Sequence, residues 1–306
     1  MTARTKIRVS LLLALALIAA VKLILPAPKK PKASTDAFWV DKTFSDKRNN
    51  VVVAGDSRAY RGVAIASLEE ALGQGLTATN LGYSAAGFSP DYLDHAVSRL
   101  DDSGPRILVL GITPHSLTSV AFANEHFQSF RHKGQFEVFT NKYLSDVLRQ
   151  FDPYSPVELI SSKKRKQYDV YHASGWVAST EPPVDSARAL LKYRKIFSEY
   201  QSDPNLADSL IRELTRIQAS GVHVITFRPP TTQRMRQLED ALSGFDEAAF
   251  MRQLQTAGIP YWQYSNADYT SFDGSHLHAA SAEKLGATLG AAIRELLLSR
   301  ARKEAN

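Results

Sequence analysis

The sequence contains no cysteine among its 306 residues. This absence excludes disulfide bonds and a lipid-modified cysteine, and it agrees with a location outside the bacterial cytoplasm. Internal repeats are also absent, and the glycines form no phosphate-binding loop. The chain therefore lacks the signatures of a disulfide-stabilised domain, of a repeat array and of a nucleotide-binding loop.

The main part of the chain has almost no net charge, although the whole chain carries a formal charge of +6. Residues 1–35 hold seven Lys and Arg residues and no acid, which leaves 30 basic and 31 acidic residues in the remainder. Attraction to anionic lipids explains this excess positive charge at the N-terminal arm. Because the remainder has no excess of basic residues, nucleic acid is not expected as a partner.

One apolar run, residues 8–25, approaches the length of a membrane span. At about 1.5 Å per residue it covers slightly less than a hydrocarbon core of about 30 Å. A cleaved signal peptide is the alternative, but no clear small-residue cleavage site follows Leu25. We expect residues 1–26 to form an uncleaved signal anchor, a single transmembrane helix in the lipid bilayer. The short N-terminal tail then favours a main domain on the extracytoplasmic, periplasmic side.

Residues 27–47, rich in Pro and Lys, are typical of a linker, and an α/β domain is expected over 48–302. In that domain, continuous apolar runs alternate with longer helical patterns. The expected strands are 51–55, 76–82, 106–111 and 222–227, and the expected helices are 66–73, 90–100, 206–221, 234–257 and 279–300. Buried strands separated by helices predict a three-layer α/β/α fold with a mainly parallel sheet, of the flavodoxin-like kind.

Residues 112–200 interrupt this rhythm and are interpreted as an insertion with some helix near 186–201. The insertion contains a basic cluster at 163–166. Such a cluster is more typical of a solvated loop than of a site for an anionic polymer or lipid head groups.

Ser57 follows the first expected strand, and a loop before the last expected helix holds Asp273 and His276. In a parallel sheet, reactive groups gather at the carboxyl ends of the strands, so the two loops are expected to share one edge. A serine hydroxyl needs an imidazole to take its proton, and the imidazole needs a carboxylate to orient it. The alternative interpretation is that Asp56 or Ser57 only caps the following helix.

The sequence resembles the SGNH hydrolase superfamily, also called GDSL-like esterases. The resemblance rests on "GDSR" at residues 55–58, "NLGYSAAGFSP" at 80–90, "LVLGITPHSL" at 108–117 and "DGSHL" at 273–277. It implies that Ser57 is the nucleophile and that Asp273 and His276 complete a catalytic triad. No metal or cofactor is implied. His115, after the third strand, is a candidate for the same edge.

Two of the matched blocks depart from the family pattern. Where the family supplies a glycine amide to the oxyanion hole, the spacing here gives Ala85, with Gly87 close by. Where the family has an asparagine donor, this chain has Thr113. Loss of one oxyanion donor costs about 3 kcal/mol of transition-state stabilisation, which lowers the expected efficiency of generic hydrolysis. Arg58 is a candidate for binding an anionic substrate group or for pairing with a local acid.

The chain resembles SGNH-like proteins that work beside membrane-bound O-acyltransferases. The resemblance rests on three features: the "GDSR" start, the N-terminal anchor and the Gly-x-x-Pro third block. This resemblance implies acyl transfer on a cell-envelope polysaccharide or related ester, either as an O-acyltransferase or as an esterase. A membrane-bound O-acyltransferase is then the implied partner. From a different class, a non-catalytic SGNH-fold module that binds a glycan or a membrane partner remains open, and Thr113 supports it.

Overall fold

The computed structural model describes residues 35–144 other than Gln74, residues 169–182 and 186–304, and scattered residues between 5 and 20. The predicted basic cluster at 163–166 and most of the predicted anchor lie outside these described residues. Within them, no helix combines the length and the apolar character that crossing a membrane requires.

The chain divides into two compact units, Met1–Val40 with Gly134–Lys166 and Asp41–Lys133 with Gln167–Asn306. The first unit contains helix α8 (Gln135–Phe139), which continues into a π-helical turn at Thr140–Leu144. The second contains the sheet and all predicted site residues. Helix α2 (Thr35–Phe44) begins in the first unit and ends in the second, so the expected linker over 27–47 contains a helix.

The second unit is built on a five-stranded sheet with the order β2-β1-β3-β6-β7. All neighbouring strands are parallel. The strands are β1 (Val51–Gly55), β2 (Ala78–Asn80), β3 (Ile107–Gly111), β6 (His223–Phe227) and β7 (Tyr261–Trp262). Four of them fall within or next to the ranges expected from the sequence. Strand β7 is a two-residue edge strand, too short to give a sequence signal.

Helices cover the sheet on both faces. Alternate strand residues, including Val53, Val109 and Ile225, share one buried cluster with side chains of α4 (Ile65–Leu72) and α15 (Ala279–Glu304). Helices α5 (Pro90–Ser98) and α12 (Pro204–Ala219) pack on β1 and β6. The intervening strand residues, such as Val52 and Leu108, are also fully buried. The mainly parallel, three-layer arrangement agrees with the predicted fold class.

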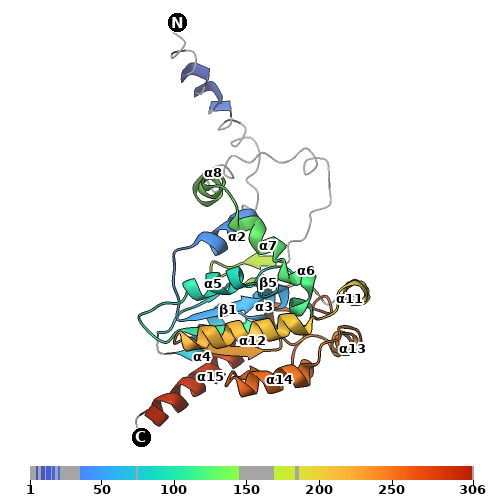
Figure 1. Ribbon diagram of the computed structural model, residues 1–306. Helices are drawn as coiled ribbons and strands as arrows, with labels where there is room; N and C mark the ends of the chain where they lie inside the picture. The colour runs from blue at the N-terminus through green and yellow to red at the C-terminus, as the bar shows by residue number, and fades with distance from the viewer. Residues whose placement is uncertain are drawn as a thin grey trace. The chain divides into compact units, whose positions relative to one another are not determined.

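Helices α4 and α15 are neighbours (Figure 1). They approach each other closely because α15 carries glycines one turn apart. A Cβ atom on Gly286 would lie 2.3 Å from the carbonyl oxygen of Ala64, and one on Gly290 would lie 2.3 Å from that of Leu68. Any larger residue would push the helices apart. This close packing fixes the start of α15, and with it the loop that precedes the helix.

Two regions differ from the sequence-based expectation. The expected helix over 234–257 is two helices, α13 (Gln233–Leu242) and α14 (Glu247–Thr256). The break is stabilised by Asp246, whose side chain caps α14 by accepting a hydrogen bond from the Ala249 N–H at 2.9 Å. The expected insertion contains an antiparallel hairpin of β4 (Asp169–Tyr171) and β5 (Val177–Ser179), and helix α11 (Ala187–Glu199).

Candidate active site

A tight turn after β1 positions Ser57. Gly55 has a φ of 143°, and a Cβ atom there would lie 2.6 Å from the carbonyl oxygen of Gly111. Asp56 then caps helix α3 (Ser57–Gly62), because its Oδ1 accepts a hydrogen bond from the Arg58 N–H at 2.9 Å. The cap is therefore Asp56, and Ser57 begins the helix with its side chain free for another role.

A second loop, immediately before α15, holds Asp273 in a fixed orientation. Its Oδ1 accepts hydrogen bonds from the backbone N–H groups of Ser275 and His276, at 2.9 and 2.8 Å. Its Oδ2 lies 2.7 Å from Nδ1 of His276. The Asp-x-x-His spacing thus lets one carboxylate bind both the backbone and the ring of the same histidine.

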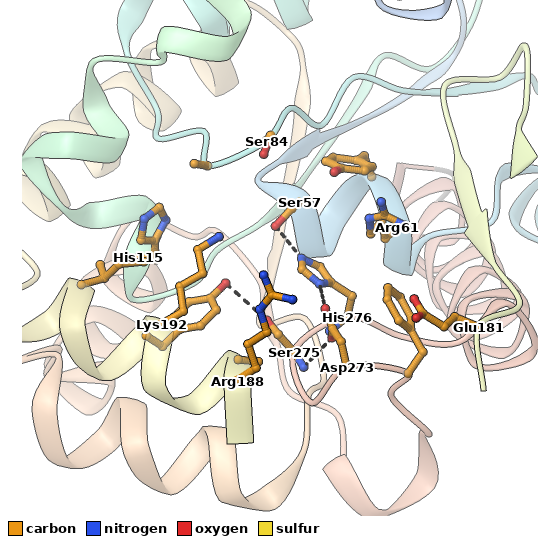
Figure 2. Close-up of a pocket in the computed structure, with 16 residues that line it drawn as sticks. Ser57, Arg61, Ser84, His115, Glu181, Arg188, Lys192, Asp273, Ser275 and His276 are labelled. Carbon is orange, nitrogen blue, oxygen red and sulfur yellow. Dashed lines mark hydrogen bonds and ion pairs between the residues drawn. The ribbon is translucent and has the colours of Figure 1, made fainter. Parts of the chain in front are cut away.

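The structure brings Ser57, Asp273 and His276 together (Figure 2). Nε2 of His276 lies 2.8 Å from Oγ of Ser57, within reach of direct proton transfer. Burial by itself raises the pKa of Asp273, but hydrogen bonds from the His276 ring and from two backbone amides hold that pKa well below its ordinary value. Asp273 is therefore a carboxylate at neutral pH, as a residue that orients an imidazole must be.

Two backbone amides are available as oxyanion donors. Ala85 lines the same pocket as Ser57 and has a φ of 51°. Neither the Ala85 N–H nor the Ser57 N–H donates a hydrogen bond to any group in the described part of the chain. The loop that carries Ala85 is held by Asn80, whose side chain donates to the carbonyl of Ala59 and accepts from the Gly82 N–H.

Gly87 and Thr113 are not placed as the sequence suggested. The Gly87 N–H already donates to the Ala121 carbonyl at 2.8 Å and to Oδ1 of Asn124 at 3.0 Å. Thr113 is fully buried, and its single hydroxyl hydrogen is donated to Oδ2 of Asp56 at 2.7 Å. Neither residue lines the pocket. The expectation that they contact an oxyanion is therefore not met by this geometry.

Arg58 pairs with a buried acid and does not face the pocket. Its Nη2 lies 2.6 Å from Oε1 of Glu239 on α13, and both side chains are almost completely buried. Its Nε donates to Oγ of Ser275 at 3.1 Å. Of the two roles considered for Arg58, the structure therefore favours pairing with an acid. Glu239 also binds Arg228 at 2.9 Å, so one carboxylate lies between two guanidinium groups.

We expect Arg58→Met to lower the free energy of unfolding by about 3–5 kcal/mol, because it removes one partner of a buried ion pair and leaves Glu239 less compensated. Denaturant-induced unfolding measures this loss. Arg216→Met is the matched control, since Arg216 pairs with Asp94 at 2.7 Å on the exposed surface. Its loss should be below about 1 kcal/mol. Equal losses in the two variants would contradict the assignment of a stabilising role to the buried pair.

Ser57 and His276 lie in a pocket of about 1020 Å³ (Figure 2). His115 lines it, at the edge where the sequence placed it as a candidate, and is buried. Burial lowers the pKa of His115, so its ring is neutral at neutral pH. Several other residues line the pocket without any local sequence signal that predicts them here; they are Tyr60, Arg61, Ser84, Glu181, Arg188, Lys192, Tyr193 and Phe272.

Helix α11 supplies much of the pocket wall that sequence reasoning missed. A helix near 186–201 was expected, but nothing in its pattern shows where it packs. The structure shows that α11 packs through Tyr193, whose hydroxyl accepts a hydrogen bond from Oγ of Ser275 at 3.3 Å. The ring of Tyr193 also lies 5.1 Å from the guanidinium carbon of Arg58. The helix is thus attached to the loop that carries His276.

The hairpin β4–β5 is attached to α3 at the other end of the pocket. Arg61 binds Asp169 through two hydrogen bonds, at 2.9 and 3.0 Å. The indole N–H of Trp176 donates to the Arg61 carbonyl at 3.0 Å, and Trp176 is buried. Trp176 is therefore a packing residue and not an exposed platform for a sugar ring.

No family model and no curated protein matches the chain. Similar solved structures include a protein from Bacteroides fragilis described as an acylhydrolase, with 11% identity, a TM-score of 0.41 and coverage of 88% of this chain and 100% of that chain. A carbohydrate acetylesterase from Sinorhizobium meliloti has 12% identity and a TM-score of 0.33, with 83% and 99% covered. An inhibitor-bound aryl esterase from M. smegmatis has 10% identity and a TM-score of 0.35, with 83% and 99% covered. Likeness at these levels carries no information about the chemistry of this chain.

Proposed function

We propose that the protein is a serine-dependent acyl-transfer enzyme that acts on esters. The observation that carries this proposal is the continuous set of short contacts from Asp273 Oδ2 to His276 Nδ1 and from His276 Nε2 to Ser57 Oγ. A structural cap would not require an imidazole at 2.8 Å from the serine hydroxyl. The pocket above the serine offers the volume for an ester with a sugar-sized group.

The proposed reaction has two steps. Ser57 Oγ attacks the acyl carbonyl and gives its proton to His276 Nε2, and the tetrahedral oxyanion is stabilised by the N–H groups of Ser57 and Ala85. The alcohol leaves with the proton from His276, and the acyl group remains on Ser57. In the second step, water or another hydroxyl gives its proton to His276 and attacks the acyl carbonyl. The bond from the acyl carbon to Ser57 Oγ then breaks, and His276 returns the proton to Ser57. Water as acceptor completes ester hydrolysis, and a sugar hydroxyl completes O-acyl transfer.

We propose a cell-envelope polysaccharide as the substrate or acceptor, on the extracytoplasmic side of the membrane. Three features support it: the apolar run at residues 8–25, the absence of cysteine, and the sequence resemblance to proteins that work beside membrane-bound O-acyltransferases. A non-catalytic glycan-binding module is the second candidate. The observation that favours it is the engagement of the Thr113 hydroxyl by Asp56, which leaves the oxyanion with backbone donors and no contribution from Thr113.

A fluorophosphonate probe distinguishes the two candidates. It should label the wild-type protein covalently and fail to label Ser57→Ala, because only an activated serine reacts at a useful rate. Intact mass spectrometry measures the added mass, and circular dichroism confirms that the variant is folded. Folded wild-type protein that stays unlabelled by several such probes would favour the binding module.

Hydrolysis and transfer are separated by following the acyl group. With an acetyl ester as donor and a polysaccharide as added acceptor, free acetate and polysaccharide-bound acetate are measured side by side. A transferase should lower the yield of free acetate as the acceptor concentration rises, because the acceptor competes with water for the acyl-enzyme. An unchanged yield of free acetate would identify an esterase. His276→Ala should remove both products.

A further inference from the structure

One wall of the pocket carries two cations from helix α11. Arg188 and Lys192 are one helical turn apart, and both line the pocket. Figure 2 shows both side chains extending from α11 into the pocket, toward the side where Ser57 and His276 lie. Residues four apart on a helix have Cβ atoms about 6 Å apart, so both cations can reach one ligand.

Neither of these cations has a hydrogen bond or ion pair with any residue in the part of the chain that the structure describes. The third pocket cation, Arg61, differs, because both of its terminal nitrogens bind Asp169. Of the pocket carboxylates, Asp273 is held by His276. Glu181 lies across the pocket, on the opposite side of His276 from Lys192 (Figure 2). The α11 wall therefore has uncompensated positive charge.

Two other cationic residues of α11 serve as a comparison, because they occupy ordinary solvent-exposed positions. Arg194 and Lys195 are exposed and do not line the pocket. Arg188 and Lys192 are also accessible to water, but they point into the space beside the serine. His115, next to Lys192 in Figure 2, is neutral at neutral pH and adds hydrogen-bonding capacity without charge.

We propose that Arg188 and Lys192 form an anion subsite that selects esters bearing an oxyanion, a carboxylate or a phosphate, close to the ester group. This inference rests on the acyl-transfer function proposed above and names the substrate class. An arginine offers forked donors that match two oxygens of either group, and a lysine adds a point charge. The two possible sources are a uronate carboxylate and a sugar phosphate.

Three esters of one sugar test the subsite: a mono-O-acetylated methyl glucoside, the corresponding methyl glucuronoside and the corresponding 6-phosphate. Acetate release gives kcat/KM for each at low ionic strength. We expect the wild-type protein to favour at least one anionic ester over the neutral ester by about five- to tenfold, since accessible charge pairs contribute modestly and are screened by salt. The preference should shrink as salt is added. The anionic ester with the higher kcat/KM identifies the carboxylate or the phosphate as the preferred group.

In Arg188→Gln/Lys192→Gln, the ratio of kcat/KM for the anionic ester to that for the neutral ester should fall to about one. The matched control is Arg194→Gln/Lys195→Gln, which removes the same charge from the same helix outside the pocket. The control should keep the wild-type ratio. A wild-type ratio of one, or an equal fall of the ratio in both double variants, would overturn the subsite.

Direct binding separates failure of the subsite from failure of the proposed function. If the wild-type protein releases no more acetate than Ser57→Ala, acyl transfer is wrong while the subsite still has its own test. That test is calorimetric titration of the wild-type protein and both double variants. The sugars used are methyl glucuronoside, methyl glucoside and methyl glucoside 6-phosphate. Tighter binding of an anionic sugar that is lost only in Arg188→Gln/Lys192→Gln supports the subsite. Equal binding of neutral and anionic sugars by the wild-type protein overturns it.

Discussion

Replacing Ser57 by alanine is expected to lower kcat for ester cleavage by about 10⁴- to 10⁶-fold, because the acyl group then has no oxygen to which it can be transferred. His276→Ala should cause a loss of similar size, since the two residues act as one unit across a contact of 2.8 Å. The double variant should be no worse than either single variant. Acetate release from an acetyl ester, measured with excess enzyme, covers this range of rates.

Ser98→Ala is the control for this series. Ser98 is exposed on α5, and its hydroxyl donates to the His95 carbonyl at 2.8 Å and to no other group among the described residues. Its kcat should match that of the wild-type protein. Ester cleavage that persists at the wild-type rate in folded Ser57→Ala would place the reaction at another residue and remove the basis of the proposed function.

Asp273→Asn is expected to lower kcat by about 10⁴-fold while keeping the shape of the side chain. The carboxylate accepts the hydrogen on His276 Nδ1, which leaves Nε2 free to take the serine proton. An asparagine amide can instead donate to Nδ1, so the ring hydrogen moves to Nε2 and the imidazole can no longer act as the base. KM should change much less than kcat, because the substrate pocket keeps its shape.

Exposed Asp268, in the short 3₁₀ turn before the same loop, gives the matched control Asp268→Asn. That variant should retain the wild-type kcat. If Asp273→Asn and Asp268→Asn have the same kcat, the carboxylate at 273 does not orient the imidazole.

The low pKa of Asp273 also links this residue to stability. Because the folded-state pKa lies below the unfolded value of about 3.9, the carboxylate stabilises the fold at pH values above the unfolded pKa. This contribution is lost as the pH falls through the folded-state pKa. The difference in unfolding free energy between the wild-type protein and Asp273→Asn should therefore narrow as acid is added below about pH 5.

Buried strands and long helices could be predicted because each depends on the pattern of apolar residues within a short stretch of sequence. The runs at 51–55 and 106–111 contain apolar residues at consecutive positions, as strands covered on both faces require. The division of 234–257 into α13 and α14 was missed because Ser243 to Asp246 lie inside an otherwise helical pattern. Strand β7 was missed because two residues carry no periodicity.

The candidate site was readable only in part. Ser57 and His276 could be named because a short motif lies at the end of each of two predicted elements. Arg58 and Thr113 carry polar groups that suit a substrate equally well, and their partners are distant in sequence. Glu239 is 181 positions from Arg58, and Asp56 is 57 positions from Thr113. No local pattern shows such pairings.

The sequence by itself determined the layered α/β class and the identity and order of the serine, aspartate and histidine, because both follow from residue types at short spacings. Only the tertiary structure decided that Arg58 and Thr113 bond to buried acids, that Ala85 rather than Gly87 keeps a free amide, and that α11 directs Arg188 and Lys192 into the pocket. Those outcomes depend on which side chains meet after residues far apart in the chain are packed together. A hydrogen that is already donated to one buried partner is no longer available to a substrate.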